Sequence, residues 1–179
     1  MPVVWPMLEH PFFGEILVPY ESRLTLELRA LLHSQRVAAL ATINDDASPF
    51  VSMVPFAIEP LLRCLVIHVS GLAAHTGNLQ ARPAVSVLVM RSEVPGEPVH
   101  ALPRVTLEGQ AKVLERESTV WHACRTAYLE RFPEAEFMTQ LSDFRFVAIE
   151  LKGARQVAGF GAARSMDAGE VRQALASAG

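Results

Sequence analysis

The sequence predicts a mainly β fold with helices (α+β), in which six antiparallel strands close into a barrel with flanking helices. Six segments have β-type patterning, turn-forming residues separate several of them, and only a few stretches have the apolar spacing of a helix. Closing antiparallel strands into a barrel removes exposed sheet edges, and helices placed between strands cover its ends. One barrel domain is therefore expected.

Length and composition fit this expectation. A chain of 179 residues is within the range of a single domain with one core. Half of the residues (50%) are hydrophobic, more than one small core easily hides, which indicates a subunit interface or a cofactor cleft. The net charge of −3, with Lys and Arg scattered, gives no footprint for nucleic acid. Without a membrane-length apolar run or a leader pattern, we expect no membrane contact and a cytoplasmic location.

The chain is expected to open with an irregular N-terminal arm at residues 1–22, followed by the barrel domain at residues 23–163. Prolines predict the arm, and they stand at Pro2, Pro6, Pro11 and Pro19. A helix is expected from about residue 22 to 33, because leucines recur there at helical spacing. These leucines are Leu24, Leu28, Leu31 and Leu32.

The strands follow this helix in six segments. They are expected at residues 36–43, 49–58, 63–69, 84–91, 104–115 and 143–151. Asn44-Asp45-Asp46 predicts a hairpin between the first two, and residues 59–62 are expected to close the next pair. The segment 92–103 contains three prolines and a glycine, so it is expected to be a loop.

Helices are also expected near the end of the strand series. One spans about residues 118–132 and is stopped by Pro133. Residues 164–179 are expected to form a C-terminal tail, either as a weak terminal helix or as a frayed end. The only glycine-rich piece, residues 159–161, follows the last strand with no long helix after it, which argues against a doubly wound dinucleotide-binding fold.

The segment Ser70 to Leu79 (SGLAAHTGNL) places small and polar residues where an apolar strand ends and a short helix begins. The backbone N–H groups of a helix start can hold a phosphate. Ser70 and Thr76 add hydroxyl groups, and His75 can add a positive charge. The alternative is that this turn only connects a strand to a helix.

Four segments together resemble the FMN-binding split barrels related to pyridoxamine 5'-phosphate oxidase, and most closely their haem-utilisation (HugZ-type) branch. They are PFVSMVPFAI, LVIHVSGLAAHTGNLQARPAVSVLV, PRVTLEGQAKVL and ARQVAGFG, of which SGLAAHTGNL and VAGFG are the most specific. The resemblance covers residues 23–163. It implies a six-stranded antiparallel split β-barrel and a homodimer with FMN at the subunit interface.

The resemblance also implies which residues contact the cofactor. They are Ser52, Met53, Val54, His68, Val69, Ser70, Ala74, His75, Thr76, Asn78, Arg104 and Phe160. The FMN phosphate needs charge-assisted donors, which His75 and Arg104 would supply together with the hydroxyl groups of Ser70 and Thr76. The flavin ring needs an apolar slot with a few amide donors, which the strand around Met53 can offer.

Four of these residues have a simpler structural explanation. His75 can face water, Arg104 can pair with Glu108, and Phe160 can fill a gap in a core or interface. His68 lies in a strong β segment, which favours a satisfied core or interface histidine.

The remaining histidines and cysteines predict no metal site. His33, His100 and His122 lack partners at ligand spacing. Cys64 and Cys124 lie far apart in the sequence and are expected to be two buried thiols. No catalytic residue can be assigned.

Two departures from the resembled family bear on function. The basic and tyrosine residues with which the oxidase holds the phosphate of its substrate have no counterpart, which argues against vitamin B6 oxidation. The haem-utilisation proteins carry a haem-ligating histidine near the C-terminus, whereas no histidine follows His122 here. The expected function is an FMN-dependent oxidoreductase acting with a small-molecule substrate or electron donor. The alternatives are a non-catalytic FMN- or haem-binding protein and a haem-degrading oxygenase.

Overall fold

The computed structural model describes residues 21–176. The expected N-terminal arm therefore lies outside the described residues, apart from its last two positions, and residues 177–179 lie outside them as well. The division into arm, barrel and tail stays a prediction.

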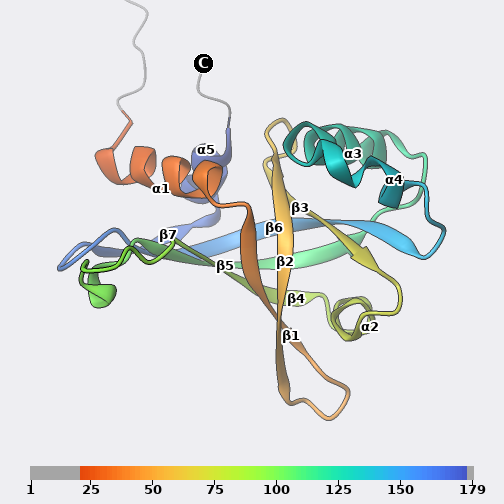
Figure 1. Cartoon of the computed structure of the whole chain (residues 1–179), viewed down its shortest axis with the longest axis horizontal. Coiled ribbons are helices and arrows are strands. Elements are labelled where there is room, and N and C mark those ends of the chain that lie inside the picture. Colours follow the sequence, from red (N-terminus) through yellow and green to blue (C-terminus); the bar gives the residue numbers. More distant parts are fainter. Residues whose placement is uncertain (1–20, 177–179) are drawn as a thin grey trace, which may run out of the picture.

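Six antiparallel strands form the closed barrel that the sequence predicts (Figure 1). The strands are β1 (Val37–Ile43), β2 (Pro49–Glu59), β3 (Cys64–Ser70), β4 (Ala84–Met90), β5 (Arg104–Val113) and β6 (Phe144–Val157). Their order is β3-β2-β1-β4-β5-β6, and β3 pairs with β6 to close the barrel. The predicted hairpin between β1 and β2 is confirmed, since the Asn44 N–H donates to the Ser48 carbonyl at 2.9 Å.

The end of the sheet differs from the sequence expectation. β6 continues to Val157, and a further strand, β7 (Ala163–Asp167), pairs with its second half. This half was missed because its inward positions include the buried polar Gln156, which breaks the apolar alternation. The register of the β5–β6 pairing shifts between Glu108 and Gly109. A Cβ atom at position 109 would stand 2.6 Å from the Glu150 carbonyl oxygen.

Helices α1 (Arg23–Ser34) and α5 (Ala168–Leu175) pack together on one side of the barrel (Figure 1). Of the two alternatives for the C-terminal segment, the helix is the one that the structure shows. Asp167 and Glu170 form a capping box at its start. The apolar faces of both helices belong to the main core, which fills the barrel; they contribute Leu28, Leu31, Leu32, Val171, Ala174 and Leu175.

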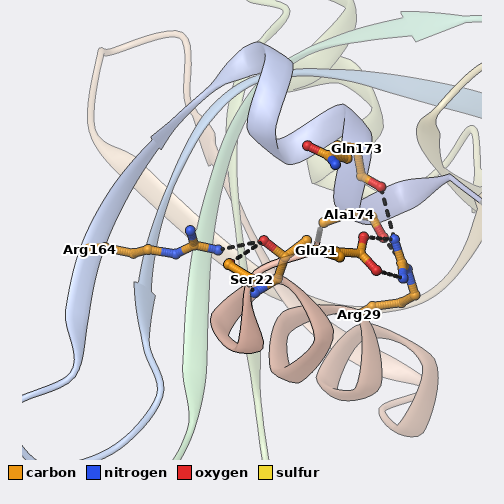
Figure 2. Close-up of polar contacts among 7 residues, drawn as sticks. Glu21, Ser22, Arg29, Arg164, Gln173 and Ala174 are labelled. Atoms are coloured by element: carbon orange, nitrogen blue, oxygen red, sulfur yellow. Dashed lines mark hydrogen bonds and ion pairs between the residues drawn. The ribbon is translucent and has the colours of Figure 1, made fainter. Parts of the chain in front are cut away.

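A polar cluster, which we call the α1–α5 clasp, joins these helices to β7 (Figure 2). Its members are Glu21, Ser22, Thr25, Arg29, Arg164, Gln173 and Ala174. The Arg29 guanidinium group donates to both carboxylate oxygens of Glu21, and also to the carbonyl oxygens of Ala174 at 3.2 Å and Gln173 at 3.1 Å. Arg164 donates to the Thr25 hydroxyl at 3.2 Å. The clasp therefore caps the C-terminal end of α5 with a cation.

A second core lies outside the barrel, beneath α3 (Thr119–Arg131). The short helices η2 (Pro133–Ala135) and α4 (Glu136–Thr139), which the sequence did not predict, complete this cover (Figure 1). Cys64 and Cys124 both belong to this second core as buried free thiols, as the sequence predicts. The loop between β4 and β5 is confirmed and contains one turn of 3-10 helix, η1 (Val99–Ala101).

Arg131, the last residue of α3, reaches back to the end of α1. Its guanidinium group donates to the carbonyl oxygens of Leu32 at 3.0 Å, His33 at 3.1 Å and Gln35. The same group lies over the Phe56 ring, with its Cζ atom 5.1 Å from the ring centroid.

None of the helices within residues 21–176 has the length and apolar composition that a membrane crossing needs.

Candidate functional site

The turn after β3 is built around Ser70, Gly71 and Asp143. The Gly71 N–H donates to the Asp143 carbonyl oxygen at 2.6 Å, and a Cβ atom at Gly71 would stand 2.9 Å from that oxygen. Glycine is therefore required for this close approach. The Ser70 hydroxyl donates to the Asp143 carboxylate at 3.1 Å and accepts the Leu72 N–H at 3.2 Å. The Ser70 hydroxyl group is thus already hydrogen-bonded within the fold, both as a donor and as an acceptor.

The helix that follows, α2 (Ala74–Ala81), has no side-chain cap at its first turn. The Thr76 hydroxyl donates to the Ser70 carbonyl at 2.7 Å. The Asn78 amide donates to Thr42 at 3.1 Å and to Asn44 at 2.8 Å, and this ties α2 to β1 and its turn. Thr76 and Asn78 are both buried, so they act within the fold rather than as free donors for a ligand.

His75 projects from α2 toward β2. Its Nδ1 atom lies 2.9 Å from the Ser52 hydroxyl oxygen, whereas its Nε2 atom is buried without a hydrogen-bond partner. Burial lowers the pKa of His75 below its ordinary value. Burial therefore favours the neutral imidazole and disfavours the positive charge that the sequence suggested for this position.

His68 lies on β3, two residues before Ser70. Its ring centroid is 4.3 Å from that of Phe146 and 5.0 Å from that of Phe144, and the side chain is 8% exposed. Burial lowers the pKa of His68 to about 4, although the Asp143 carboxylate acts in the opposite direction. The histidine is a core residue, as one reading of the sequence held. Its Nδ1 atom nevertheless has no hydrogen-bond partner, so the histidine is not satisfied.

We call this group of Ser52, His68, Ser70, His75 and Asp143 the β3–α2 junction. Sequence reasoning missed Asp143, although it stands at the first position of the predicted strand 143–151. The contact between Asp143 and Ser70 depends on the pairing of β3 with β6, which places Ser70 opposite Phe144.

The other residues expected at the site divide by their surroundings. Val54 and Val69 belong to the barrel core, so only their backbone is left for a ligand. Met53 points outward from β2 and is 64% exposed, and Ala74 is exposed at the start of α2.

Arg104 and Phe160 lie at the other end of the barrel. Arg104 pairs with Met90, the last residue of β4, whereas α2 leads into the first residue of that strand. The guanidinium group donates to the Leu102 carbonyl at 3.0 Å and not to Glu108. Phe160 is 83% exposed in the turn between β6 and β7. The fold of this chain therefore does not bring Arg104 and Phe160 to the junction.

The junction offers a ligand the neutral imidazole of His75, which has one unpartnered ring nitrogen. The His68 side chain faces the second core instead, where it lies against Tyr128 and Phe146. Within the described part of the chain, no group of three or more His, Cys, Asp or Glu side chains is placed to hold a metal ion. An imidazole nitrogen can instead ligate an iron that a larger group carries.

The amino-acid sequence of this chain is similar to one protein family and to two heme oxygenases. The sequence profile of the family described as pyridoxamine 5'-phosphate oxidase matches residues 24–158. Heme oxygenase HutZ of Vibrio cholerae is 28% identical over 144 residues, which cover 80% of this chain and 81% of that protein. The chloroplastic non-canonical heme oxygenase HOZ of Arabidopsis thaliana is 35% identical over 139 residues, 74% of this chain but only 40% of that protein.

Solved structures agree with the sequence relatives. A heme binding protein from Mycobacterium smegmatis superposes with a TM-score of 0.77 at 27% identity, covering 86% of this chain and 62% of that one. HutZ from Vibrio cholerae, described there as a heme storage protein, superposes with a TM-score of 0.66 at 28% identity, covering 74% of this chain and 94% of that one.

Proposed function

The chain belongs to the pyridoxamine 5'-phosphate oxidase family, near its haem-utilisation branch, and on this premise we propose that it binds haem at the β3–α2 junction and degrades it. The observation that carries the proposal is His75, a neutral histidine with one ring nitrogen held and the other unpartnered. The similarity to a heme oxygenase and to heme binding proteins supports the same assignment.

The residues present fit a haem iron. A metal-ligating histidine engages its other ring nitrogen with a neighbouring group, which fixes the ring, and the Ser52 hydroxyl is such a neighbour for His75. The lowered pKa of His75 keeps the imidazole in the neutral form that ligates metals.

Protein atoms cover the Nε2 atom of His75, so haem binding requires the imidazole ring to turn or α2 to shift. The first turn of α2, which carries His75, is suited to such a shift because it has no side-chain cap, whereas Asn78 holds the following turn to β1. Haem, when bound, supplies the iron centre for oxygen chemistry, while the chain binds the group, orients it and excludes water.

FMN is the second candidate, and the family match supports it. The described residues of one protomer do not fit its phosphate group. Ser70, Thr76 and Asn78 use their side chains as donors within the fold, and His75 is neutral. Arg104 lies at the other barrel end, so it would have to come from a second copy of the chain.

A homodimer is part of the proposal. The outward face of β2, β1 and β4 presents apolar side chains that water would otherwise cover: Val37, Val51, Met53 and Met90, which are 49%, 61%, 64% and 47% exposed. Ala39 lies opposite both Met53 and Leu88, so these residues form one continuous face. A second copy seated there would bury it.

Titration with haem tests the ligand. We expect a Soret band that saturates near one haem per protomer, and an at least tenfold weaker affinity with an altered band in His75→Ala. His122→Ala is the matched control, because His122 is exposed on α3. Absence of a Soret band, or a haem affinity that is unchanged in His75→Ala, would reject the proposed site. Flavin retained in place of haem would support FMN.

The reaction and the assembly need separate measurements. Reduction of the haem complex with ascorbate in air is expected to bleach the Soret band and release a bilin; a stable complex would leave binding without degradation. Light scattering is expected to give a dimer for the native chain and a monomer for Met53→Glu, with Leu61→Glu, which is 88% exposed on a turn, as control. The cytoplasmic location stays a prediction.

A further inference from the structure

We propose that a cavity beside His68, which we call the His68 pocket, binds a planar aromatic carboxylate. The cavity has a volume of about 490 Å³ and lies between β3, β6, the segment after β5, the start of α3 and the end of α4. Its lining includes His68, Arg116, Trp121, Ser142, Phe144 and Arg145. This volume is in the range of small-molecule sites.

Aromatic side chains line one wall of the pocket. The Trp121 ring meets Phe146 edge to face, with centroids 5.6 Å apart and planes at 84°. Phe144 and Phe146 both lie tilted at 32° to the His68 ring. A wall of this kind contacts a flat ring through its faces and edges better than it contacts a branched aliphatic group.

Two guanidinium groups stand at the pocket. Arg145 donates through Nη1 to the carbonyl oxygens of Ser142 and Phe144, which fixes its side chain. Arg116 is held by a 3.5 Å contact with the Thr139 carbonyl and by its position over Trp121, 5.9 Å from the ring centroid. An arginine has five N–H donors, so these bonds leave donors for an anion. Carboxylate is the group whose two oxygens match a guanidinium group.

The acidic residues nearby do not cancel this charge. Glu115 lines the pocket and Glu117 lies 3.8 Å from Arg116, but both side chains are exposed to water, where an ion pair contributes little. Asp143 does not line the pocket, and its carboxylate is turned to the Ser70 hydroxyl, from which it accepts a hydrogen bond. The arginines therefore leave the pocket favourable to an anion.

His68 supplies an observation that independently points to a ligand. The side chain is more than nine-tenths buried, it lines the pocket, and its Nδ1 atom has no hydrogen-bond partner. Leaving a buried polar atom unpaired is unfavourable, and a polar substituent on a bound ring can pair with it. The neutral imidazole has one donor and one acceptor nitrogen, which suits a hydroxyl substituent beside the carboxylate.

Salicylate, which combines a planar ring, a carboxylate and a hydroxyl group, is the probe. NMR spectra of protein labelled with ¹⁵N in its six histidines would follow each imidazole separately. We expect salicylate to shift the His68 signals saturably. We expect Arg116→Gln and Arg145→Gln each to weaken binding at least fivefold. Arg91→Gln, which alters an exposed arginine paired with Glu97, is expected to leave binding unchanged.

Analogues test the two halves of the ligand. Salicylamide keeps the ring without the charge, and cyclohexanecarboxylate keeps the charge without the planar ring, so both are expected to bind at least tenfold more weakly. Equal binding of all three, no saturation, or affinity unchanged in both arginine variants would overturn the proposal. Because Arg145 also holds backbone carbonyls, thermal melting would check each variant, and Arg116→Gln tests the site if Arg145→Gln does not fold.

The inference does not rest on the proposed function. The His75→Ala variant, expected to lose haem, is expected to keep the salicylate shift at His68. Loss of haem binding with the shift retained would reject the haem site alone, whereas haem binding without the shift would reject the pocket alone.

Discussion

The α1–α5 clasp and the β3–α2 junction both join segments far apart in the sequence through polar side chains, but they differ in how those side chains are satisfied. In the clasp, Arg29 meets a carboxylate and two helix carbonyls, and Arg164 meets a hydroxyl (Figure 2). In the junction, His68 and His75 each retain a buried nitrogen without a partner. The polar side chains of the clasp are thus paired within the fold, whereas the junction keeps two buried ring nitrogens unpaired, which is the feature on which the proposed binding sites depend.

Removing Arg29 should have the largest effect, because it breaks the clasp. Arg29→Met leaves two carbonyl oxygens of α5 and the Glu21 carboxylate without their charged donor, so we expect the free energy of unfolding to fall by about 2 kcal/mol. Urea unfolding would measure it. Arg23→Met is the control, since Arg23 is exposed and its pair with Glu27 contributes about 0.5 kcal/mol or less. An equal fall in the free energy of unfolding of both variants would show that the clasp stabilises the fold no more than an exposed ion pair does.

The pH dependence of stability separates the two regions. Folding lowers the pKa of His68 from 6.5 to about 4, so its contribution is complete above pH 6.5 and is lost as the pH falls toward 4. His33 and His75 also have lowered pKa values and act in the same direction. The hydrogen bond from Arg29 lowers the pKa of Glu21, so the clasp weakens only at more acidic pH.

We therefore expect the free energy of unfolding to fall by about 1 to 2 kcal/mol between pH 7 and pH 5, discounted for the partial exposure of the histidines. Urea unfolding at the two pH values measures the loss. His68→Phe should reduce it and Arg29→Met should not. An unchanged loss in His68→Phe would assign the effect to other groups.

Substitution of His68 should have a smaller effect of opposite sign to that of Arg29. His68→Phe removes an unpaired buried nitrogen while keeping a ring beside Phe144 and Phe146, so we expect unfolding at pH 7 to require about 1 kcal/mol more. Denaturant melts of the two proteins decide it. A destabilised variant would mean that the nitrogen is satisfied by water in the free protein.

The smallest effect should come from Asp143, which links the junction to β6. Its carboxylate raises the pKa of His68 against the larger effect of burial, so Asp143→Asn is expected to bring that pKa slightly further down. An NMR titration of the His68 imidazole reads this directly, with Asp46→Asn at the β1–β2 turn as control. A rise in the pKa would contradict the assigned roles.

The sequence predicted the elements that carry regular apolar patterns. All six barrel strands and the helices α1 and α3 were expected close to where they lie, and the turn at Asn44 was identified from its polar residues. β7 and α4 were missed, because a buried Gln156 and a short helix give no clear period. The closure of β3 on β6 depends on pairing across the whole chain.

Only part of the candidate site could be predicted, because contacts between segments distant in sequence leave no local pattern. The motif from Ser70 to Leu79 located the junction, but nothing local reveals that Thr76 donates to Ser70 or that Asp143, distant in sequence, takes the Ser70 hydroxyl. The environment that keeps His75 neutral is likewise tertiary. Residue type thus located the candidate junction, whereas tertiary packing decides which of its polar groups are already paired within the fold.

The reach of Arg131 has a consequence for how the chain folds. Its guanidinium group completes the last turn of α1 from 99 residues away in sequence, so that turn gains its partners only after α3 has docked on the barrel. A contact of such separation pays its loop-closure entropy late in folding. Hydrogen exchange should therefore show the final amides of α1 opening together with those of α3, as one cooperative unit rather than as a fraying end.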